Sequence, residues 1–139
     1  MTDASNILSP REGMNSLRNV RAQRVKANII HLTYESPYVT MEDIYDSEEL
    51  IQSLVPDGPR YVIASLPNLR GSESSVRRHP PLPGTQGVAL VYASPVGRMI
   101  TQAYLRLKGS KVPTRMFKTR DQAIQWIEQL GKPEIGANV

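Results

Sequence analysis

Hydrophobic residues follow two different periods in the second half of the chain. A run of β-branched and small apolar residues at 87–93 is followed, from Ser94 onward, by apolar residues at helical spacing. The order then repeats, with a short strand pattern at residues 112–117 and a second helical pattern that begins at Thr119. A strand-helix-strand-helix order predicts a sheet with helices packed on it.

Both helical patterns begin with residues that cap helices. Ser94 precedes Pro95, which is typical of an N-cap followed by proline at the first helical position. Thr119 and Gln122 have the spacing of a capping box. The stripe expected to face inward in the first helix consists of Val96, Met99, Ile100, Ala103, Tyr104 and Leu107. The inward stripe of the second consists of Ala123, Ile124, Trp126, Ile127 and Leu130, which predicts a core position for Trp126.

The first half of the chain carries weaker patterns. Residues 28–34 give the clearest strand, and a preceding strand is expected at residues 18–25. Thr40 begins a helix, with Asp43 completing an imperfect capping box. Residues 60–66 form a β-branched run between prolines, which predicts an interior strand covered on both faces.

The segment between residues 67 and 84 differs from its surroundings. It contains four prolines and reads as a long loop. Residues 71–78 have the composition of one helical turn, which Ser72 would cap. Long loops in compact domains are often functional, so we expect a site here.

Length and composition predict one soluble domain. The chain has 139 residues, of which 40% are hydrophobic and 22% charged. We expect a flexible lead-in at residues 1–16, one α/β domain at 17–132 and a tail at 133–139. No apolar run approaches the roughly 20 residues of a membrane-spanning helix, and no secretory signal is visible, so a cytoplasmic location is expected. The absence of cysteine excludes disulfides, thiolate nucleophiles and cysteine-based metal sites.

The charged residues are unevenly distributed. Seven acidic and no basic residues lie between Glu35 and Asp57, whereas seven basic and no acidic residues lie between Gly97 and Arg120. These segments predict either solvated helix surfaces, or contacts between an acidic and a basic face within one copy or between two copies.

The second half of the chain resembles a known family. The stretches VALVYASPVGRMITQAYLRL and PTRMFKTRDQAIQWIEQL are similar to the C-terminal half of small bacterial STAS/SpoIIAA-like (STAS/SEC14-type) proteins, and the likeness extends over about residues 18–130. The resemblance implies an α/β fold with a mixed sheet of four or five strands and helices packed on it. It also implies a signalling or protein-interaction module, and, from its SEC14 side, an apolar pocket beneath a mobile loop.

The same resemblance indicates a candidate interaction or switch loop. Anti-sigma factor antagonists of this fold are switched by phosphorylation of a serine or threonine in the region that here contains Ser72, Ser74 and Ser75. Their Asp-Ser-Ser/Thr-Gly signature is absent from this chain. A phosphoryl group would lie beside several basic residues of the loop. The alternative is that these serines belong to an ordinary polar loop without a switch. The basic and imidazole residues of the candidate loop are Arg70, Arg77, Arg78 and His79.

The residues give no catalytic, metal or cofactor constellation. His31 and His79 are too far apart for a metal-ligand motif, and no nucleophile elbow or phosphate-binding glycine loop is present. A weak anion contact is offered by Ser94 at a helix start with Arg98 one turn later. The acidic segment and the lack of aromatic residues within the basic segment argue against nucleic-acid binding.

The sequence therefore predicts a non-enzymatic regulatory or interaction module of STAS/SpoIIAA-like type, with a protein partner or a second copy as its ligand. The alternative is a small-molecule or lipid-binding domain with a pocket under the 67–84 loop. The two differ in one structural respect. Leu69, Val76 and Leu82 should line a cavity in a binding domain and be exposed in an interaction module.

Overall fold

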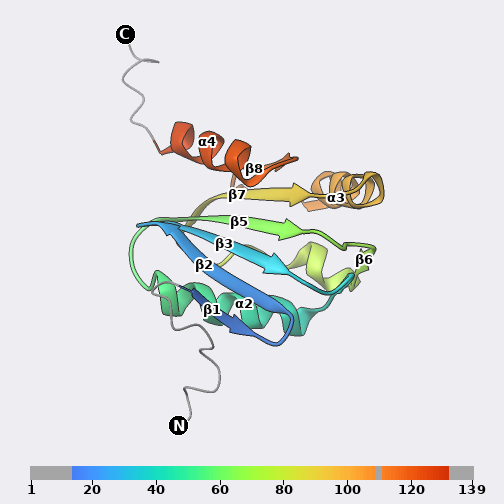
Figure 1. Ribbon diagram of the computed structural model, residues 1–139, viewed down its shortest axis with the longest axis horizontal. Coiled ribbons are helices and arrows are strands. Elements are labelled where there is room, and N and C mark those ends of the chain that lie inside the picture. The colour runs from blue at the N-terminus through green and yellow to red at the C-terminus, as the bar shows by residue number, and fades with distance from the viewer. Residues whose placement is uncertain (1–13, 109–110, 132–139) are drawn as a thin grey trace.

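The computed structural model describes residues 14–108 and 111–131, which form strands and helices in nearly the predicted order (Figure 1). The strands are β1 (Met14–Leu17), β2 (Val20–Lys26), β3 (Ile29–Tyr34), β4 (Tyr38–Val39), β5 (Arg60–Leu66), β6 (Gly71–Ser72), β7 (Thr85–Tyr92) and β8 (Thr114–Phe117). The helices are α2 (Met41–Leu54), the short 3-10 helix η1 (Ser74–Arg78), α3 (Pro95–Lys108) and α4 (Arg120–Leu130). The α/β class predicted from the sequence is confirmed.

Six strands form the main sheet in the order β1-β2-β3-β5-β7-β8, which corrects the expectation of four or five. The first three strands pair antiparallel, and β3, β5, β7 and β8 run parallel. The count was too low because β1 begins before residue 17, within the segment expected to be a lead-in. A four-residue strand is too short to show a clear alternation of apolar and polar residues.

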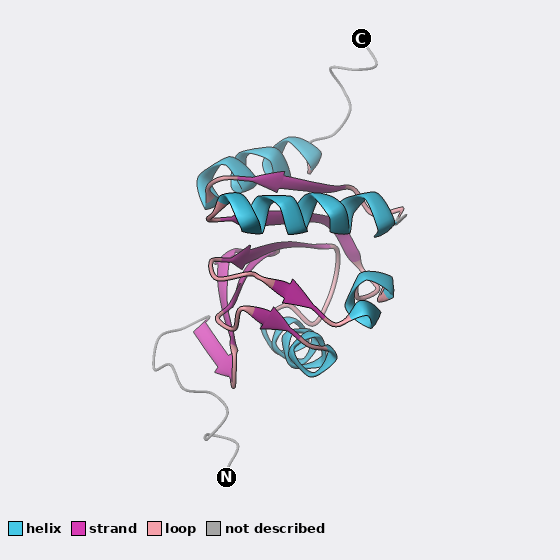
Figure 2. Ribbon diagram, turned by 90° about the vertical axis from the view of Figure 1, so that its right-hand side faces the viewer, coloured by secondary structure: helices cyan, strands magenta, loops and turns pink. Residues whose placement is uncertain are grey.

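The helices divide between the two faces of the sheet (Figures 1 and 2). Val62 and Ala64 of β5 point to the face that we call the α2 face, where α2 packs over β1 to β3 and α3 packs against β7 and β8. Ile63 points to the opposite face, the α4 face, and packs with Ala123 and Ile127 of α4. The central strand β5 is therefore buried on both sides, as its continuous apolar sequence predicted.

Local capping signals placed the helix starts correctly. Thr40 and Asp43 form a complete capping box at the start of α2. The Ser94 hydroxyl accepts a hydrogen bond from the Gly97 amide at 3.0 Å at the start of α3. The Thr119 hydroxyl likewise accepts from the Gln122 amide at the start of α4.

The inward face of α3 differs from the predicted stripe. Met99 is 71% exposed and Val96 is 46% exposed, although both were expected in the core. Gly97 and Thr101 are buried instead, beside the half-buried Ile100 and Tyr104. Small residues allow a helix to approach its neighbours closely. Close packing, and not hydrophobicity alone, therefore decides which residues of α3 face inward.

The N-terminal hairpin is attached to α2 by an ion pair. Arg18 occupies the turn between β1 and β2 with a φ of +46°, a conformation that a non-glycine residue rarely adopts. Its guanidinium donates to both carboxylate oxygens of Asp46, which is buried on α2. One acidic residue of α2 is thus paired with a basic residue of the first hairpin.

The loop between β5 and β7 contains more regular structure than predicted. Ser72 pairs in β6 with Val39 of β4, in a small parallel sheet. It does not cap the helical turn, because η1 begins later, at Ser74, and follows Glu73 without a side-chain cap. The pairing is between residues distant in sequence, so local composition gave no sign of it.

Candidate binding cavity

A cavity of about 160 Å³ lies on the α2 face, above the central strand β5. The α2 helix covers the strands on one side of β5 and α3 covers those on the other, so neither helix closes the space between them. The segment that contains η1 and residues 79–82 closes it instead. Figure 2 shows η1 at the end of the sheet, where it contacts both α2 and α3.

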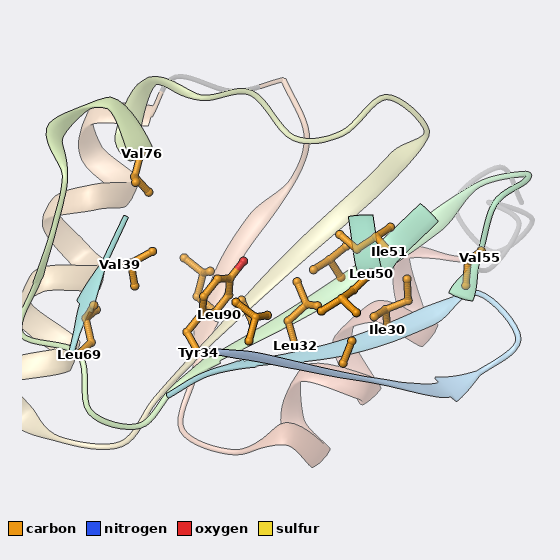
Figure 3. Close-up of a cluster of buried hydrophobic side chains, with 14 residues drawn as sticks. Ile30, Leu32, Tyr34, Val39, Leu50, Ile51, Val55, Leu69, Val76 and Leu90 are labelled. Atoms are coloured by element: carbon orange, nitrogen blue, oxygen red, sulfur yellow. The ribbon is translucent and has the colours of Figure 1, made fainter. Parts of the chain in front are cut away.

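The walls of the cavity are mostly apolar side chains from every element around it. The sheet contributes Leu32, Val62, Ala64, Val88 and Leu90, α2 contributes Ile44 and Ile51, and α3 contributes Ile100. Figure 3 shows Leu32, Tyr34 and Leu90 rising from the sheet, with Val39, Leu69 and Val76 lying to one side of them. A well-packed core leaves few spaces larger than a water molecule, so a cavity of this size is a distinct feature.

Leu69, Val76 and Leu82 line this cavity. From the sequence, they are expected to do so in a binding domain and to be exposed in an interaction module. Leu69 and Val76 are each 7% exposed, and Leu82 is partly buried against the same cluster. The loop therefore directs its apolar side chains inward, onto the cavity. This is the arrangement expected of a binding domain.

Two of the residues that line the cavity, Tyr34 and Ser47, carry hydroxyl groups. Burial, partly offset by a hydrogen bond with Ser47, raises the pKa of the Tyr34 phenol above its ordinary range. The phenol therefore stays protonated at any physiological pH. Ser47 also donates to the backbone carbonyl of Ile44 at 2.6 Å.

His79 is paired rather than solvated in the loop. Its Nε2 lies 2.7 Å from a carboxylate oxygen of Glu48 on α2, and its ring meets the ring of Tyr45 edge-on. Both His79 and Glu48 line the cavity. This contact joins the end of η1 to α2 and so helps to hold the loop over the cavity.

Two polar side chains at the beginning of β5 and β7 are buried and carry atoms without a hydrogen-bond partner among the described residues. Arg60 is 6% exposed and Thr85 is 7% exposed, and they face each other in the β5–β7 register. The Arg60 Nε and Nη1 atoms and the Thr85 Oγ1 atom have no partner within the described part of the chain. Thr85 lines the cavity.

Backbone contacts fix Arg60 beside this wall. Its amide donates to the carbonyl of Gly84 at 3.0 Å. A Cβ atom added to Gly84 would lie 3.5 Å from Arg60 Nη2, so the guanidinium lies next to the residue that precedes Thr85. Gly84 has a φ of +95°, which a residue with a side chain rarely adopts.

The sequence did not single out Arg60 or Thr85. An arginine at the start of a strand is usually exposed, and a lone threonine carries no motif. The only available signal is the position of Arg60 at the head of an otherwise apolar interior strand. Its burial depends on the loop at 82–85, which is distant in sequence.

The candidate switch loop does not form a single site. Arg70, Ser74, Ser75 and Arg78 are exposed, Arg77 is half-buried, and of the candidate loop residues Ser72 and His79 line the cavity. The remaining candidates, Ser94 and Arg98, border a separate surface hollow with Tyr92, Met99 and Lys118. There the Ser94 hydroxyl caps its own helix.

A second polar pair lies on the α4 face. His31 Nε2 of β3 is 2.6 Å from Ser65 Oγ of β5. Burial, together with the positive charges of Arg120 and Arg21, lowers the pKa of His31 to about 4. The imidazole is therefore neutral at physiological pH. No side-chain hydrogen bond joins a carboxylate to this histidine among residues 14–108 and 111–131, so an activated serine is not indicated.

His31 is expected to make the protein less stable as the pH falls from about 6.5 to about 4. The folded state has the lower pKa, so unfolding takes up a proton in this range, and the contribution of the neutral imidazole to stability is complete only above it. Between pH 7.5 and pH 5 the wild type should lose about 1 kcal/mol more stability than His31→Gln does, after allowance for solvent screening. Urea unfolding of both proteins at both pH values measures this difference.

The two proteins differ only at residue 31, so the comparison isolates the contribution of this side chain. Glutamine retains groups that can hydrogen-bond to Ser65 but does not titrate in this range. The prediction is wrong if the stabilities of the two proteins depend on pH in the same way, because folding then does not lower the pKa of His31.

Residues 14–108 and 111–131 contain no group of three or more histidine or acidic side chains placed to hold a metal ion. No helix within these ranges combines the length and the apolar character needed to cross a bilayer.

Comparison with known proteins identifies a family without assigning a function. No match was found among curated proteins or solved structures. A family model described as "Domain of unknown function (DUF7793)" matches residues 23–131, which include β3, β5, β7, β8 and all three long helices. The chain therefore belongs to the DUF7793 family.

Proposed function

We propose that this protein binds a small apolar molecule in the cavity beneath the 67–84 loop. The supporting observation is the cavity of about 160 Å³ itself, lined mainly by apolar side chains of the sheet, α2, α3 and the loop. An engineered protein cavity of about 150 Å³ with apolar walls admits benzene, so the space suits an aromatic ring or a short alkyl chain. A few hydroxyl groups on an otherwise apolar wall are typical of small-molecule sites.

The position of the loop favours this function over an interaction module. An interaction module was expected to expose Leu69, Val76 and Leu82, whereas these side chains line the cavity. The STAS/SEC14 resemblance also implies a pocket beneath a loop. The cavity is partly open to solvent, which provides an entry route for a ligand.

Ala64→Leu is expected to abolish binding of hexan-1-ol by filling the cavity. Ala64 is 7% exposed and lies on the cavity floor, so a larger side chain would occupy the space meant for the ligand. Because the space is already empty, the free energy of unfolding should change by no more than about 1 kcal/mol. Isothermal titration with hexan-1-ol, together with the melting temperature at saturating alcohol, measures both effects.

Ala103→Leu is the matched control, because it makes the same change at an exposed position of α3. This variant should bind hexan-1-ol like the wild type. Failure of the wild type to bind, or equal binding by Ala64→Leu, would contradict the proposed function.

A further inference from the structure

The cavity wall carries one carboxylate and no basic side chain of the lysine or arginine type. Among the described residues that line the cavity, Glu48 of α2 supplies this carboxylate. The two buried carboxylates of the same helix are engaged elsewhere, because Asp46 is paired with Arg18 and Asp43 accepts from the Thr40 amide at 3.0 Å. The charge that the wall presents to a ligand is therefore that of Glu48.

A ligand in the cavity can reach the Glu48 carboxylate. The side chain of Glu48 is 22% exposed and that of His79 is 25% exposed, and both residues line a cavity that is partly open to solvent. Within residues 14–108 and 111–131, His79 Nε2 is hydrogen-bonded to the Oε2 atom of Glu48 and no side-chain hydrogen bond occupies Oε1. The Oε1 atom is thus able to accept from a donor on a ligand.

The pKa of Tyr34 indicates that the negative potential extends into the cavity. Burial is the main cause of the raised pKa of this phenol, and the negative charges of Asp43 and Glu48 raise it further. Tyr34 lines the cavity and lies among the apolar side chains on the α2 face (Figure 3). The buried cation Arg60 is not one of the described lining residues. An anion in the cavity would therefore be repelled by Glu48, and a cation would be attracted.

We propose that the ligand is a small alkyl or aryl amine, bound in its protonated form, with the ammonium group on the Glu48 carboxylate and the apolar part in the cavity. This inference rests on the proposed function, to which it adds the chemistry of the head group. An ammonium group donates charge-assisted hydrogen bonds to a carboxylate, and these are stronger than the hydrogen bond of a neutral alcohol. An amine should therefore bind better than an alcohol of the same length.

Isothermal titration at pH 8 with hexylamine, hexan-1-ol and hexanoate tests the inference. At this pH an alkylamine is protonated, whereas an ordinary histidine side chain is neutral and does not cancel the charge of a carboxylate. The wild type should bind hexylamine at least about fivefold more tightly than hexan-1-ol. Hexanoate should bind at least about fivefold more weakly than the alcohol.

Glu48→Gln should weaken hexylamine binding by about 5- to 20-fold and leave hexan-1-ol binding within about threefold. Glutamine keeps the shape of the side chain and an acceptor for His79 but removes the charge. Glu49→Gln is the matched control, because it makes the same change at the next residue of α2, which is exposed and is not among the described lining residues. This variant should bind hexylamine within about twofold of the wild type, since solvent and salt screen the charge of an exposed residue.

The outcomes separate this inference from the proposed function. If the wild type binds hexylamine and hexan-1-ol equally, or binds hexanoate best, the amine site is wrong although the apolar cavity is still a binding site. If none of the three compounds binds the wild type, both proposals fail. Equal weakening of hexylamine binding by Glu48→Gln and Glu49→Gln would also overturn the inference, because the attraction would then come from the general charge of α2. Should Glu48→Gln unfold, the order of the three affinities in the wild type still decides the question.

Discussion

Replacement of Arg60 by methionine is expected to raise the free energy of unfolding of the ligand-free protein by about 1 to 3 kcal/mol. The guanidinium is buried, and its Nε and Nη1 atoms have no partner within the described residues, so folding removes its hydration without replacing those hydrogen bonds. Methionine has a similar length and no charge, and exchange of buried ionic groups for apolar residues of similar volume is often stabilising. Urea unfolding in the absence of ligand measures the change.

Arg98→Met is the control for this prediction. Arg98 is exposed on α3, so the same substitution there should alter stability by no more than about 0.5 kcal/mol. A loss of more than about 1 kcal/mol in Arg60→Met would contradict this prediction and show that the guanidinium supports the fold.

The parts of the fold that depend on neighbouring residues could be predicted from the sequence. Thr40, Ser94 and Thr119 mark the helix starts because each hydroxyl caps amides a few residues ahead, and this chemistry is visible in a short window. Residues 60–66 read as a buried strand because apolar side chains continue without alternation.

The parts of the fold that depend on contacts between residues distant in sequence could not be predicted from the sequence. The helical spacing in α3 was correct, but the exposure of Val96 and Met99 depends on how closely Gly97 and Thr101 approach the neighbouring elements. The β4–β6 pairing places Ser72 opposite Val39, which no local pattern indicates.

The cavity belongs to the same class of unpredicted features. Side chains of the 67–84 loop line the cavity, but the prolines and serines of the loop do not show in the sequence which side chains turn inward. The cavity exists because two helices leave the central strand uncovered and the loop covers it without filling the space. That is a property of the tertiary arrangement, as is the burial of Arg60.

Truncation of a buried side chain should lower the free energy of unfolding by more on the α4 face than at the cavity. Ile63 is fully buried between the sheet and α4, so Ile63→Ala should lower the free energy of unfolding by about 4 kcal/mol. Leu32 is also buried, but it borders the cavity and therefore has fewer atoms packed against it on that side. Leu32→Ala should cost about 2 to 3 kcal/mol, as measured by urea unfolding of both variants.

The two variants should also differ in what they bind. Leu32→Ala enlarges the cavity, so its affinity for octan-1-ol should rise relative to hexan-1-ol, whereas Ile63→Ala leaves the cavity side of the sheet unchanged and should keep the wild-type order of affinities. If both substitutions lower the free energy of unfolding equally, and neither changes the relative affinity for octan-1-ol and hexan-1-ol, the space beside Leu32 collapses in solution. A larger preference for octan-1-ol in Leu32→Ala alone would place the alkyl chain against Leu32, on the α2 face of the sheet.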